Sequence, residues 1–336
     1  MTKKKKQHYV PQCYLAEWCM PNTNQINVFD KKQEVQRVNN IEDVASENYF
    51  YDINLEAILS QKEIEYFGLE NEDLSQIDDG QYLENLFSNT IEQAFKFDLN
   101  RIIQRVRKMN TWEIQNCLFV NSQEKKKFSL LMAVQYVRVK NVRDTIAESA
   151  NLLQQVLVDM GVSKRTIDQY CNISKNQLKY IHGKIVVNYE EIGNIAQILN
   201  NHIWILLKNN TKEVFFTSDN PIGTIAHIRD PIVSMSGVNS RGVEIYFPLS
   251  PDLLLVAFEK TYHKDIECYS NRVVETDNVE IVKYYNSVGV INSSRCVYSS
   301  NDDFSLVYEM RDKKENVLKT PKSIVHWDGK TYHPNR

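Results

Sequence analysis

The first residue that could do chemistry is His8, in the N-terminal segment His8–Leu15. Pro11 biases Val10 to an extended conformation, so His8 belongs to a stiff segment and not to a mobile tail. An imidazole titrates near neutral pH, and one held in this way can act as a base or as a metal ligand. A histidine that hydrogen-bonds a backbone carbonyl and pins the terminus explains the same residues. The residues alone favour this structural role.

A second candidate is the segment Thr217–Pro221, which reads Thr-Ser-Asp-Asn-Pro and follows an apolar run. At the end of a strand, Asp219 could bind a metal ion or transfer a proton. Ser, Asp and Asn also favour side-chain-to-backbone turns, and Pro221 pushes Asn220 out of the helical region. A tight turn is therefore the safer interpretation of these residues, with Asp219 and Asn220 kept as candidate site residues.

A third group, Gln135, Arg138 and Arg143, lies on a predicted helix, where this spacing places Gln135 and Arg138 on neighbouring parts of one face. Polar groups set into an apolar stripe need partners if they are buried. One such partner is a substrate phosphate, to which arginine presents a bidentate fork. The commoner alternative is a carboxylate of the protein itself, such as Glu84 or Glu92.

Glu47 is a fourth candidate, directly before the aromatic run Asn48–Tyr51, and a plain surface carboxylate is its alternative. Two lysine runs, Lys3–Lys6 and Lys125–Lys127, could contact nucleic acid. Such runs are usually solvated faces, so nothing in the sequence requires that contact.

Familiar catalytic motifs do not occur in the chain. There is no phosphate-binding loop, no G-x-G-x-x-G, no H-E-x-x-H and no G-x-S-x-G. The formal net charge of -3 argues against a protein that coats nucleic acid through bulk electrostatics. Any nucleic-acid or nucleotide binding must therefore be local.

Composition predicts a globular cytoplasmic protein. Hydrophobic residues make up 42% of the 336 residues and charged residues 25%, which is too apolar for a disordered chain. No apolar run approaches the roughly 20 residues that span a bilayer, and no export signal is readable after the N-terminal lysines. We therefore expect no membrane partner. The six cysteines form no C-x-x-C pair, so we expect no disulfide framework and no zinc module.

The elements that must position these residues change along the chain. Residues 26–29 and 35–38 predict a hairpin, with a further strand at 48–51. Apolar residues at helical spacing predict one long helix from 83 to 106, and a second from about 123 to 142 that continues after a break towards 158. These helices form a predicted middle layer.

The rest of the chain predicts a second lobe. Apolar runs at 202–207, 214–217, 243–247, 253–258 and 295–298 indicate strands, with a turn at Asn209–Asn210 between the first two. Helices are expected at 165–170, 190–200 and 279–290. The predicted fold class is α+β, with a small N-terminal β-sheet, a long-helix middle layer and a larger, mainly antiparallel C-terminal sheet with helices. The predicted lobes are 1–160 and 161–336, which could also form one interlocked domain.

Several of these segments together resemble the bacterial family known as domain of unknown function 4238. The succession of H-x-V-P, T-S-D-N-P and F-P-L-S-P carries the resemblance, and its order and span cover most of the chain. Cys13 stands where an aromatic or aliphatic residue is usual, which favours a packing role over a nucleophile. The segments that match are His8–Gln12 with Tyr14 and Leu15, Ile26–Asp30, Glu47 with Phe50 and Tyr51, Glu84, Glu92, Gln135–Arg143, Thr217–Pro221, Phe247–Pro251 and Asn286–Ser299.

The resemblance implies a cytoplasmic bacterial protein, with some relatives linked to defence against bacteriophage, and it implies no established reaction. It also favours the functional interpretation of His8, Gln135, Arg138, Asp219 and Asn220, because all five fall in recurring motifs. We therefore expect the N-terminal segment to pack across both lobes and to bring His8 close to Asp219 and Arg138.

Two function hypotheses follow. In the first, the protein is an anti-phage effector that acts on nucleic acid or a nucleotide, with phage components as further partners. Asp219, Glu47 and His8 then hold a divalent metal ion or move protons, and Arg138 faces phosphate. In the second, the protein is a non-enzymatic sensor or binding module, and the same polar cluster is structural. An open pocket favours the first hypothesis, and sealed, fully paired polar groups favour the second. The sequence does not predict the oligomeric state.

Overall fold

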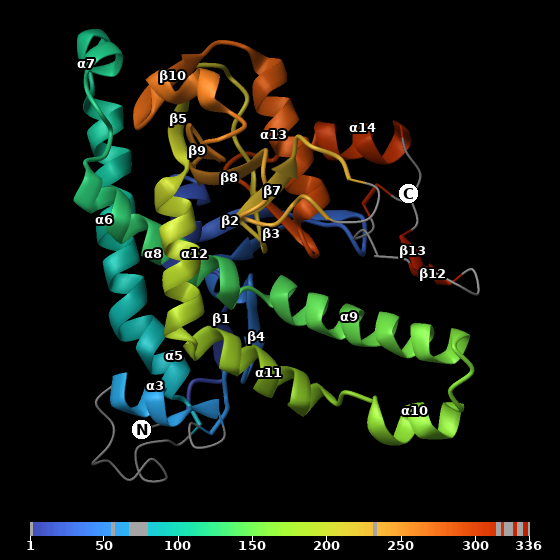
Figure 1. Cartoon of the computed structure of the whole chain (residues 1–336). Helices are drawn as coiled ribbons and strands as arrows, with labels where there is room; N and C mark the ends of the chain where they lie inside the picture. Colours follow the sequence, from blue (N-terminus) through green and yellow to red (C-terminus); the bar gives the residue numbers. More distant parts are fainter. Residues whose placement is uncertain are drawn as a thin grey trace.

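The computed structural model describes residues 3–54, 58–66, 80–230, 234–313, 317–318, 325–327 and 332–334. Its helices and two larger sheets form the α+β fold that the sequence predicts (Figure 1). None of the helices in these ranges is long and apolar enough to cross a membrane.

The N-terminal segment forms a short strand and a single helical turn. Strand β1 (Lys6–His8) pairs antiparallel with β4 (Ser46–Asn48), so that His8 lies opposite Ser46. Pro11 has an extended backbone and directly precedes helix α1 (Gln12–Leu15). The stiff extended segment expected before Pro11 is therefore present.

The predicted hairpin exists, but it belongs to a sheet that joins the two ends of the chain. Its strand β2 pairs with β11, and β11 pairs with β6, all antiparallel. The sheet order is β3-β2-β11-β6. The hairpin is therefore part of a sheet shared with C-terminal strands and not of a separate N-terminal one. The strands are β2 (Gln25–Asp30), β3 (Val35–Asn40), β6 (Thr217–Ser218) and β11 (Cys296–Ser299).

The larger sheet has the order β10-β5-β9-β8-β7, and only its β10–β5 pair is parallel. The predicted turn at Asn209–Asn210 between two paired strands is wrong, because β5 pairs with β9 and β10 while β6 joins the other sheet. The strands are β5 (Ile203–Asn209), β7 (Gly223–Ala226), β8 (Val243–Ser250), β9 (Leu253–Phe258) and β10 (Arg272–Thr276).

The predicted middle layer consists of helices, two of which, α7 and α8, begin at a capping box. Asn121 caps α8 in a capping box with Glu124, and α8 is buried on most sides between α6 and α12 (Figure 1). Its chain turns extended at Val139, which separates α8 from α9. The first long helix contains a π-turn at Phe87–Ile91 between α5 and α6. These helices are α5 (Tyr82–Leu86), α6 (Glu92–Lys108), α7 (Thr111–Asn116), α8 (Ser122–Arg138) and α9 (Lys140–Asp159).

The remaining helices surround these layers. Helix α11 was not expected from the sequence, whereas α10, α12 and α13 lie close to their predicted positions. The helices are α3 (Gln61–Tyr66), α10 (Lys164–Tyr170), α11 (Lys175–Val187), α12 (Tyr189–Asn201), α13 (Val279–Asn292) and α14 (Ser305–Lys313), and a short strand pair is formed by β12 (Val325–Trp327) and β13 (Tyr332–Pro334).

One hydrophobic core links both predicted lobes. Tyr14 stacks on Phe247 with ring centroids 5.4 Å apart, and Phe128 lies between Phe247 and Trp204. Residues from both sides of position 160 thus bury the same apolar surface. The division at 160 stays a prediction, and the shared sheet and core indicate how closely the two parts interlock.

Candidate functional site

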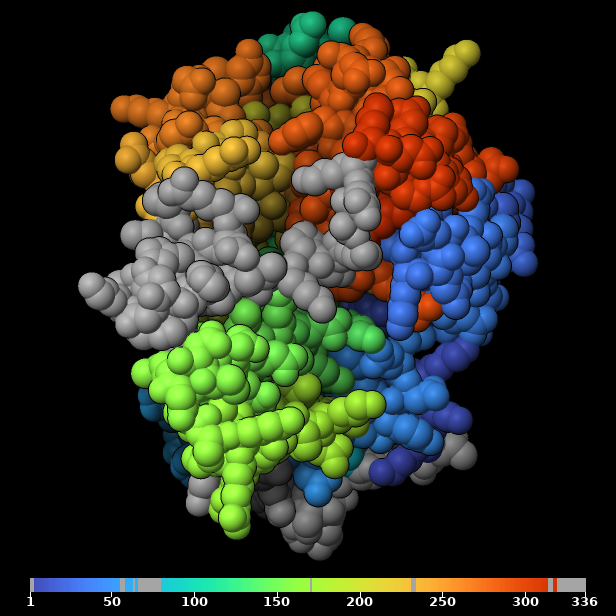
Figure 2. Space-filling view, turned by 90° about the vertical axis from the view of Figure 1, so that its right-hand side faces the viewer, coloured from blue at the N-terminus to red at the C-terminus, as the bar shows by residue number. Residues whose placement is uncertain are grey.

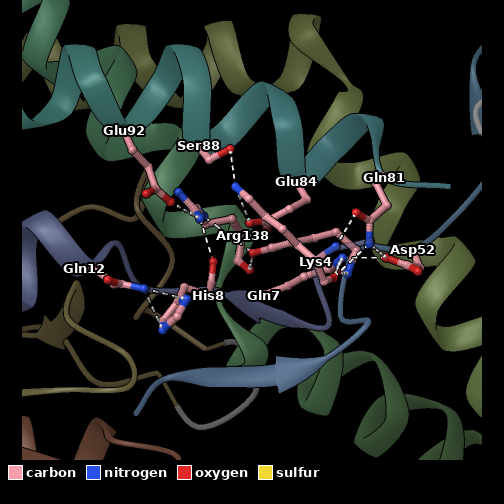
Figure 3. A network of polar contacts seen from close by, with 11 residues as sticks. Lys4, Gln7, His8, Gln12, Asp52, Gln81, Glu84, Ser88, Glu92 and Arg138 are labelled. Atoms are coloured by element: carbon pink, nitrogen blue, oxygen red, sulfur yellow. Dashed lines mark hydrogen bonds and ion pairs between the residues drawn. The ribbon is translucent and has the colours of Figure 1, made fainter. Parts of the chain in front are cut away.

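Arg138, the last residue of α8, lies in a largely buried polar cluster that we call the Arg138 cluster, which consists of Gln7, His8, Tyr51, Glu92 and Arg138. Figure 3 shows its members Gln7, His8, Glu92 and Arg138. Only 1% of Arg138 is exposed. Its Nη2 donates to the carbonyl oxygen of His8 at 2.6 Å and to Glu92 Oε1 at 2.9 Å. The guanidinium carbon lies 4.2 Å from the centre of the Phe87 ring. Arg138 therefore binds protein groups, which is the commoner of its two alternatives.

Tyr51 and Gln7 complete the Arg138 cluster. The Tyr51 hydroxyl donates to the carbonyl oxygen of Arg138 at 2.8 Å, and the Tyr51 amide donates to Gln7 Oε1. Both side chains are almost fully buried. The cluster thus joins the N-terminal strand, the segment after β4 and the start of α6 to the end of α8.

His8 takes part in this cluster through its backbone. Its ring lies beside the Gln12 amide, with Nε2 of Gln12 3.3 Å from His8 Nδ1. Burial lowers the pKa of His8, and the charge of Glu92 only partly opposes this effect. Gln135 is buried nearby, where its Nε2 donates to the carbonyl oxygen of Tyr9 at 3.1 Å. The expected approach of His8 to Arg138 is therefore a backbone contact and not an imidazole contact.

Asp219 and Asn220 fix a loop on the other side of the N-terminal segment. Asp219 is 3% exposed, and its carboxylate accepts hydrogen bonds from the backbone amides of Ser294, Arg295 and Cys296 at 2.8–2.9 Å. Asn220 Nδ2 donates to the carbonyl oxygen of Asn292 at 3.0 Å. Asp219 and Asn220 thus bind backbone groups, as expected for this motif, but these groups belong to a loop about 75 residues further along the chain.

This environment leaves Asp219 little capacity for a further ligand. Burial raises the pKa of Asp219, and the three amide hydrogen bonds only partly lower it. No group of three or more His, Cys, Asp or Glu side chains in the described ranges could hold a metal ion. The expected metal ligands His8, Glu47 and Asp219 are therefore not gathered into one centre.

A charged cavity of about 970 Å³ lies between the β2–β3 hairpin, β4, the start of α9, the loop before β11 and α14. In Figure 2, α9 lies below this region, α14 above it and the hairpin to its right. Of the six predicted site residues, Glu47 and Asp219 line the cavity, whereas His8, Gln135, Arg138 and Asn220 do not. We call this space the charged cavity because its described lining includes Lys31, Lys32, Glu34, Arg37, Asp43, Glu47, Lys140, Asp144, Asp219, Arg295 and Arg311.

The side of the charged cavity formed by β4 and α9 is mainly acidic. Glu47 on β4 forms an ion pair with Lys140, the first residue of α9. Asp144 follows one helical turn later on the same side. Burial raises the pKa of Asp144, while the charge of Lys140 lowers it. Two carboxylates thus share one lysine at this side.

Tyr9 is one of the residues that line the charged cavity. The residue is 7% exposed, and among the described residues its hydroxyl has no hydrogen-bond partner. Burial and then the charges of Asp219 and Glu47 hold the pKa of Tyr9 well above its ordinary value. The hydroxyl therefore stays protonated and can donate to a ligand.

The hairpin side of the charged cavity is basic. Arg37 on β3 and Arg295 before β11 both bind the carboxylate of Asp30, and both line the cavity. Lys31 is buried there, and its ammonium donates to the carbonyl oxygens of Val290 and Ser293 at 2.7 and 2.6 Å. Burial lowers the pKa of Lys31 to about 8.

Sequence reasoning did not identify Arg37, Lys140, Asp144 or Arg295. Their usable signals were weak: Lys140 and Asp144 have helical spacing, and Arg37 has a place in a predicted hairpin. Arg295 reaches Asp30 only because β11 pairs with β2, a contact between residues 265 positions apart. Cys13 behaves as expected for a packing residue, since it lies against the core and burial raises its pKa to about 12.

Fold and site define an α+β protein whose N-terminal segment contributes to a largely buried ionic cluster and to a charged cavity. The family model described as "Protein of unknown function (DUF4238)" matches residues 6–303. The chain therefore belongs to this family, as its motifs suggested. No curated protein and no solved structure matches the chain.

Proposed function

We propose that the protein binds a nucleotide, or a phosphorylated small molecule of similar size, in the charged cavity. The observation that carries this proposal is a space of about 970 Å³ whose described lining includes six cationic and five acidic side chains. Most small-molecule sites are predominantly apolar, so a lining this rich in charge favours a charged ligand. The size lies at the upper end of ordinary ligand pockets, which is ample for a nucleotide.

The two sides of the charged cavity suit different parts of such a ligand. Cationic Arg37 and Arg295 can bind phosphate oxygens, and carboxylates accept hydrogen bonds from amino groups or bind a cation. Tyr9 adds a neutral donor near Glu47 and Asp144. A concave site lined by both charges favours a small molecule over a nucleic-acid duplex, which needs a broad basic surface.

Phosphoryl transfer assisted by a divalent ion is the sharper form of this proposal, and Glu47 with Asp144 are the residues that would hold the ion. The contacts of Arg138, His8 and Asp219 with protein groups favour the simpler form, in which the cavity belongs to a binding module or sensor. Defence against phage is the wider role that the family resemblance implies, and it remains part of the proposal.

The direct test is thermal unfolding and calorimetric titration of the full chain with ATP, inorganic pyrophosphate and adenosine, each with magnesium or with a chelator. We expect ATP and pyrophosphate to raise the melting temperature in a concentration-dependent manner, because a ligand that binds the folded state stabilises it by about 2.7 kcal/mol at 100 times its Kd. Adenosine, which lacks phosphate, should bind much more weakly. The binding proposal is wrong if no phosphorylated compound changes the melting temperature, or if adenosine is as effective.

The variant Tyr9→Phe tests whether the ligand binds in the charged cavity. It removes one hydroxyl and keeps the ring that packs on Phe50. The loss of one hydrogen bond of about 1 kcal/mol should weaken ATP binding about fivefold.

Chromatography of ATP after incubation with the protein and magnesium distinguishes the two forms of the proposal. Magnesium-dependent product supports phosphoryl transfer, and unchanged ATP supports a binding module. Phage plaquing with wild type and Tyr9→Phe tests the wider role.

A further inference from the structure

Asp30 is a fully buried carboxylate that two cavity arginines share. Its exposed fraction is 0%, and its oxygens accept hydrogen bonds from Arg37 Nη1 at 3.0 Å and from Arg295 Nη2 at 2.7 Å. The backbone amides of Lys32 and Gln33 donate to it as well, at 3.1 and 3.2 Å. Burial raises the pKa of Asp30, but the arginine hydrogen bonds outweigh this effect and the pKa is lowered. Asp30 is therefore a fixed negative charge beneath the hairpin side of the cavity.

Three segments of the backbone hold this arrangement in place. Asp30 lies opposite Cys296 in the β2–β11 pair, and the Lys31 amide donates to the carbonyl oxygen of Arg295 at 2.8 Å. On the other side, Asp219 binds the amide of Arg295. The main chain of Arg295 is thus fixed from two directions before its side chain reaches Asp30. The arginine pair is pre-organised, which lowers the entropy cost of binding a ligand.

Each arginine keeps one amino group that no described residue binds. Arg37 uses Nε and Nη1 for protein contacts, and Arg295 uses Nε and Nη2. Nη2 of Arg37 and Nη1 of Arg295 therefore offer four N–H donors in total. The side chains are 37% and 49% exposed and both line the charged cavity. Two guanidinium charges against one carboxylate also leave an excess of one positive charge.

We propose that Arg37 and Arg295, held by Asp30, form the phosphate subsite of the charged cavity. This inference rests on the proposed function and names the residues that recognise the phosphate. Each guanidinium can donate from its free amino group to a phosphate oxygen while its other nitrogens stay bound to protein groups. The planar guanidinium fixes the direction of both sets of contacts, which an ammonium on a flexible stem does not. Nucleotides and inorganic pyrophosphate share this chemistry, so both should depend on the same two arginines.

The test compares Arg37→Lys, Arg295→Lys and the double variant with Arg107→Lys in the full chain. Arg107 is a matched control because it is 36% exposed and forms a bidentate ion pair with Asp252, but it does not line the cavity. The measurement is the Kd for ATP and for pyrophosphate at one fixed ionic strength, together with the melting temperature. Lysine keeps the charge beside Asp30, so the substitution removes mainly the amino group that is free to bind phosphate.

We expect each cavity substitution to weaken ATP and pyrophosphate about tenfold and the double variant about a hundredfold, with Arg107→Lys within twofold of wild type. If either single variant unfolds, the other decides the test alone, because the free amino groups of both side chains form the proposed subsite. The inference is overturned if the cavity variants bind both compounds like wild type while Tyr9→Phe weakens ATP, and the proposed function then survives. It is also overturned if malonate, a dicarboxylate, binds as tightly as pyrophosphate with the same dependence on the arginines. Failure of every phosphorylated compound to bind wild type would remove both proposals.

Discussion

The Arg138 cluster and the charged cavity lie on two sides of one N-terminal segment and use their charges in opposite ways. The carbonyl oxygen of His8 accepts a hydrogen bond from Arg138, and the next residue, Tyr9, lines the cavity. In the cluster the buried arginine has a carboxylate and a carbonyl as partners. In the cavity, two arginines share one carboxylate and keep unused donors.

This difference indicates that the Arg138 cluster stabilises the fold, whereas the cavity is suited to binding a ligand. A buried charge with no partner is costly, so the partners of Arg138 are needed for the fold itself. Half-exposed arginines can keep unused donors because water solvates them until a ligand arrives. Gln135, Arg138, Asp219 and Asn220 thus bind protein groups, whereas Arg37 and Arg295 keep unused donors.

The largest expected effect is that of Arg138→Ala on stability. The substitution leaves Glu92 and the carbonyl oxygen of His8 without a partner. Because the Glu92 side chain is 21% exposed, we expect a loss of about 3 kcal/mol, the lower end of the range for breaking a buried pair. Urea denaturation measures this loss.

Arg107→Ala is the control for that experiment, because its pair with Asp252 is half-exposed and should contribute less than about 1 kcal/mol. Equal losses for Arg138→Ala and Arg107→Ala would contradict the contrast between the two regions. The folded fraction of Arg138→Ala should still bind ATP, since Arg138 does not line the charged cavity.

The next effect concerns the pH dependence of stability, through His182, whose ring lies 6.4 Å from the ring of Tyr51 in the Arg138 cluster. Its Nε2 lies 2.9 Å from the carbonyl oxygen of Val137, and Arg143 donates to its Nδ1 at 3.1 Å, which requires a neutral ring. Burial lowers the pKa of His182 to about 4 from 6.5, with the charge of Arg143 as a further cause. The unfolded chain binds this proton more readily, so the stability contribution is complete above pH 6.5 and is lost as the pH falls to about 4.

The expected loss from this histidine is about 3 kcal/mol at most. It is measured by urea denaturation between pH 7 and pH 4, with His182→Gln as the comparison. The variant should lose less stability than wild type over that interval. Parallel curves for the two proteins would show that His182 is not responsible.

Local patterns in the sequence predict much of the secondary structure. Apolar spacing locates the long helices, and the polar residues between two strand-like runs locate the β2–β3 hairpin. The pairing of strands is different, because β11 reaches β2 across most of the chain and no local pattern marks that partner. The wrong pairing expected at Asn209–Asn210 has the same cause: proximity in sequence favoured a hairpin that the sheet does not form.

The candidate site was predictable only in part, for a similar reason. The sequence offered Glu84 and Glu92 as possible carboxylate partners for Arg138 and its neighbours, and Arg138 pairs with Glu92. Arg37 and Arg295 could not be paired from the sequence, since Asp30 joins them only after the four-stranded sheet has formed. A charged residue in a short polar segment resembles any solvated residue until its neighbours are known.

Hydrogen exchange of the backbone amides, with and without ATP, locates the ligand relative to the two regions. We expect slower exchange in residues 31–37 and 294–296 when ATP is present, and no change in residues 135–138. Slower exchange in 135–138 with no change around the β2–β3 hairpin would contradict it, and would place the ligand at the Arg138 cluster.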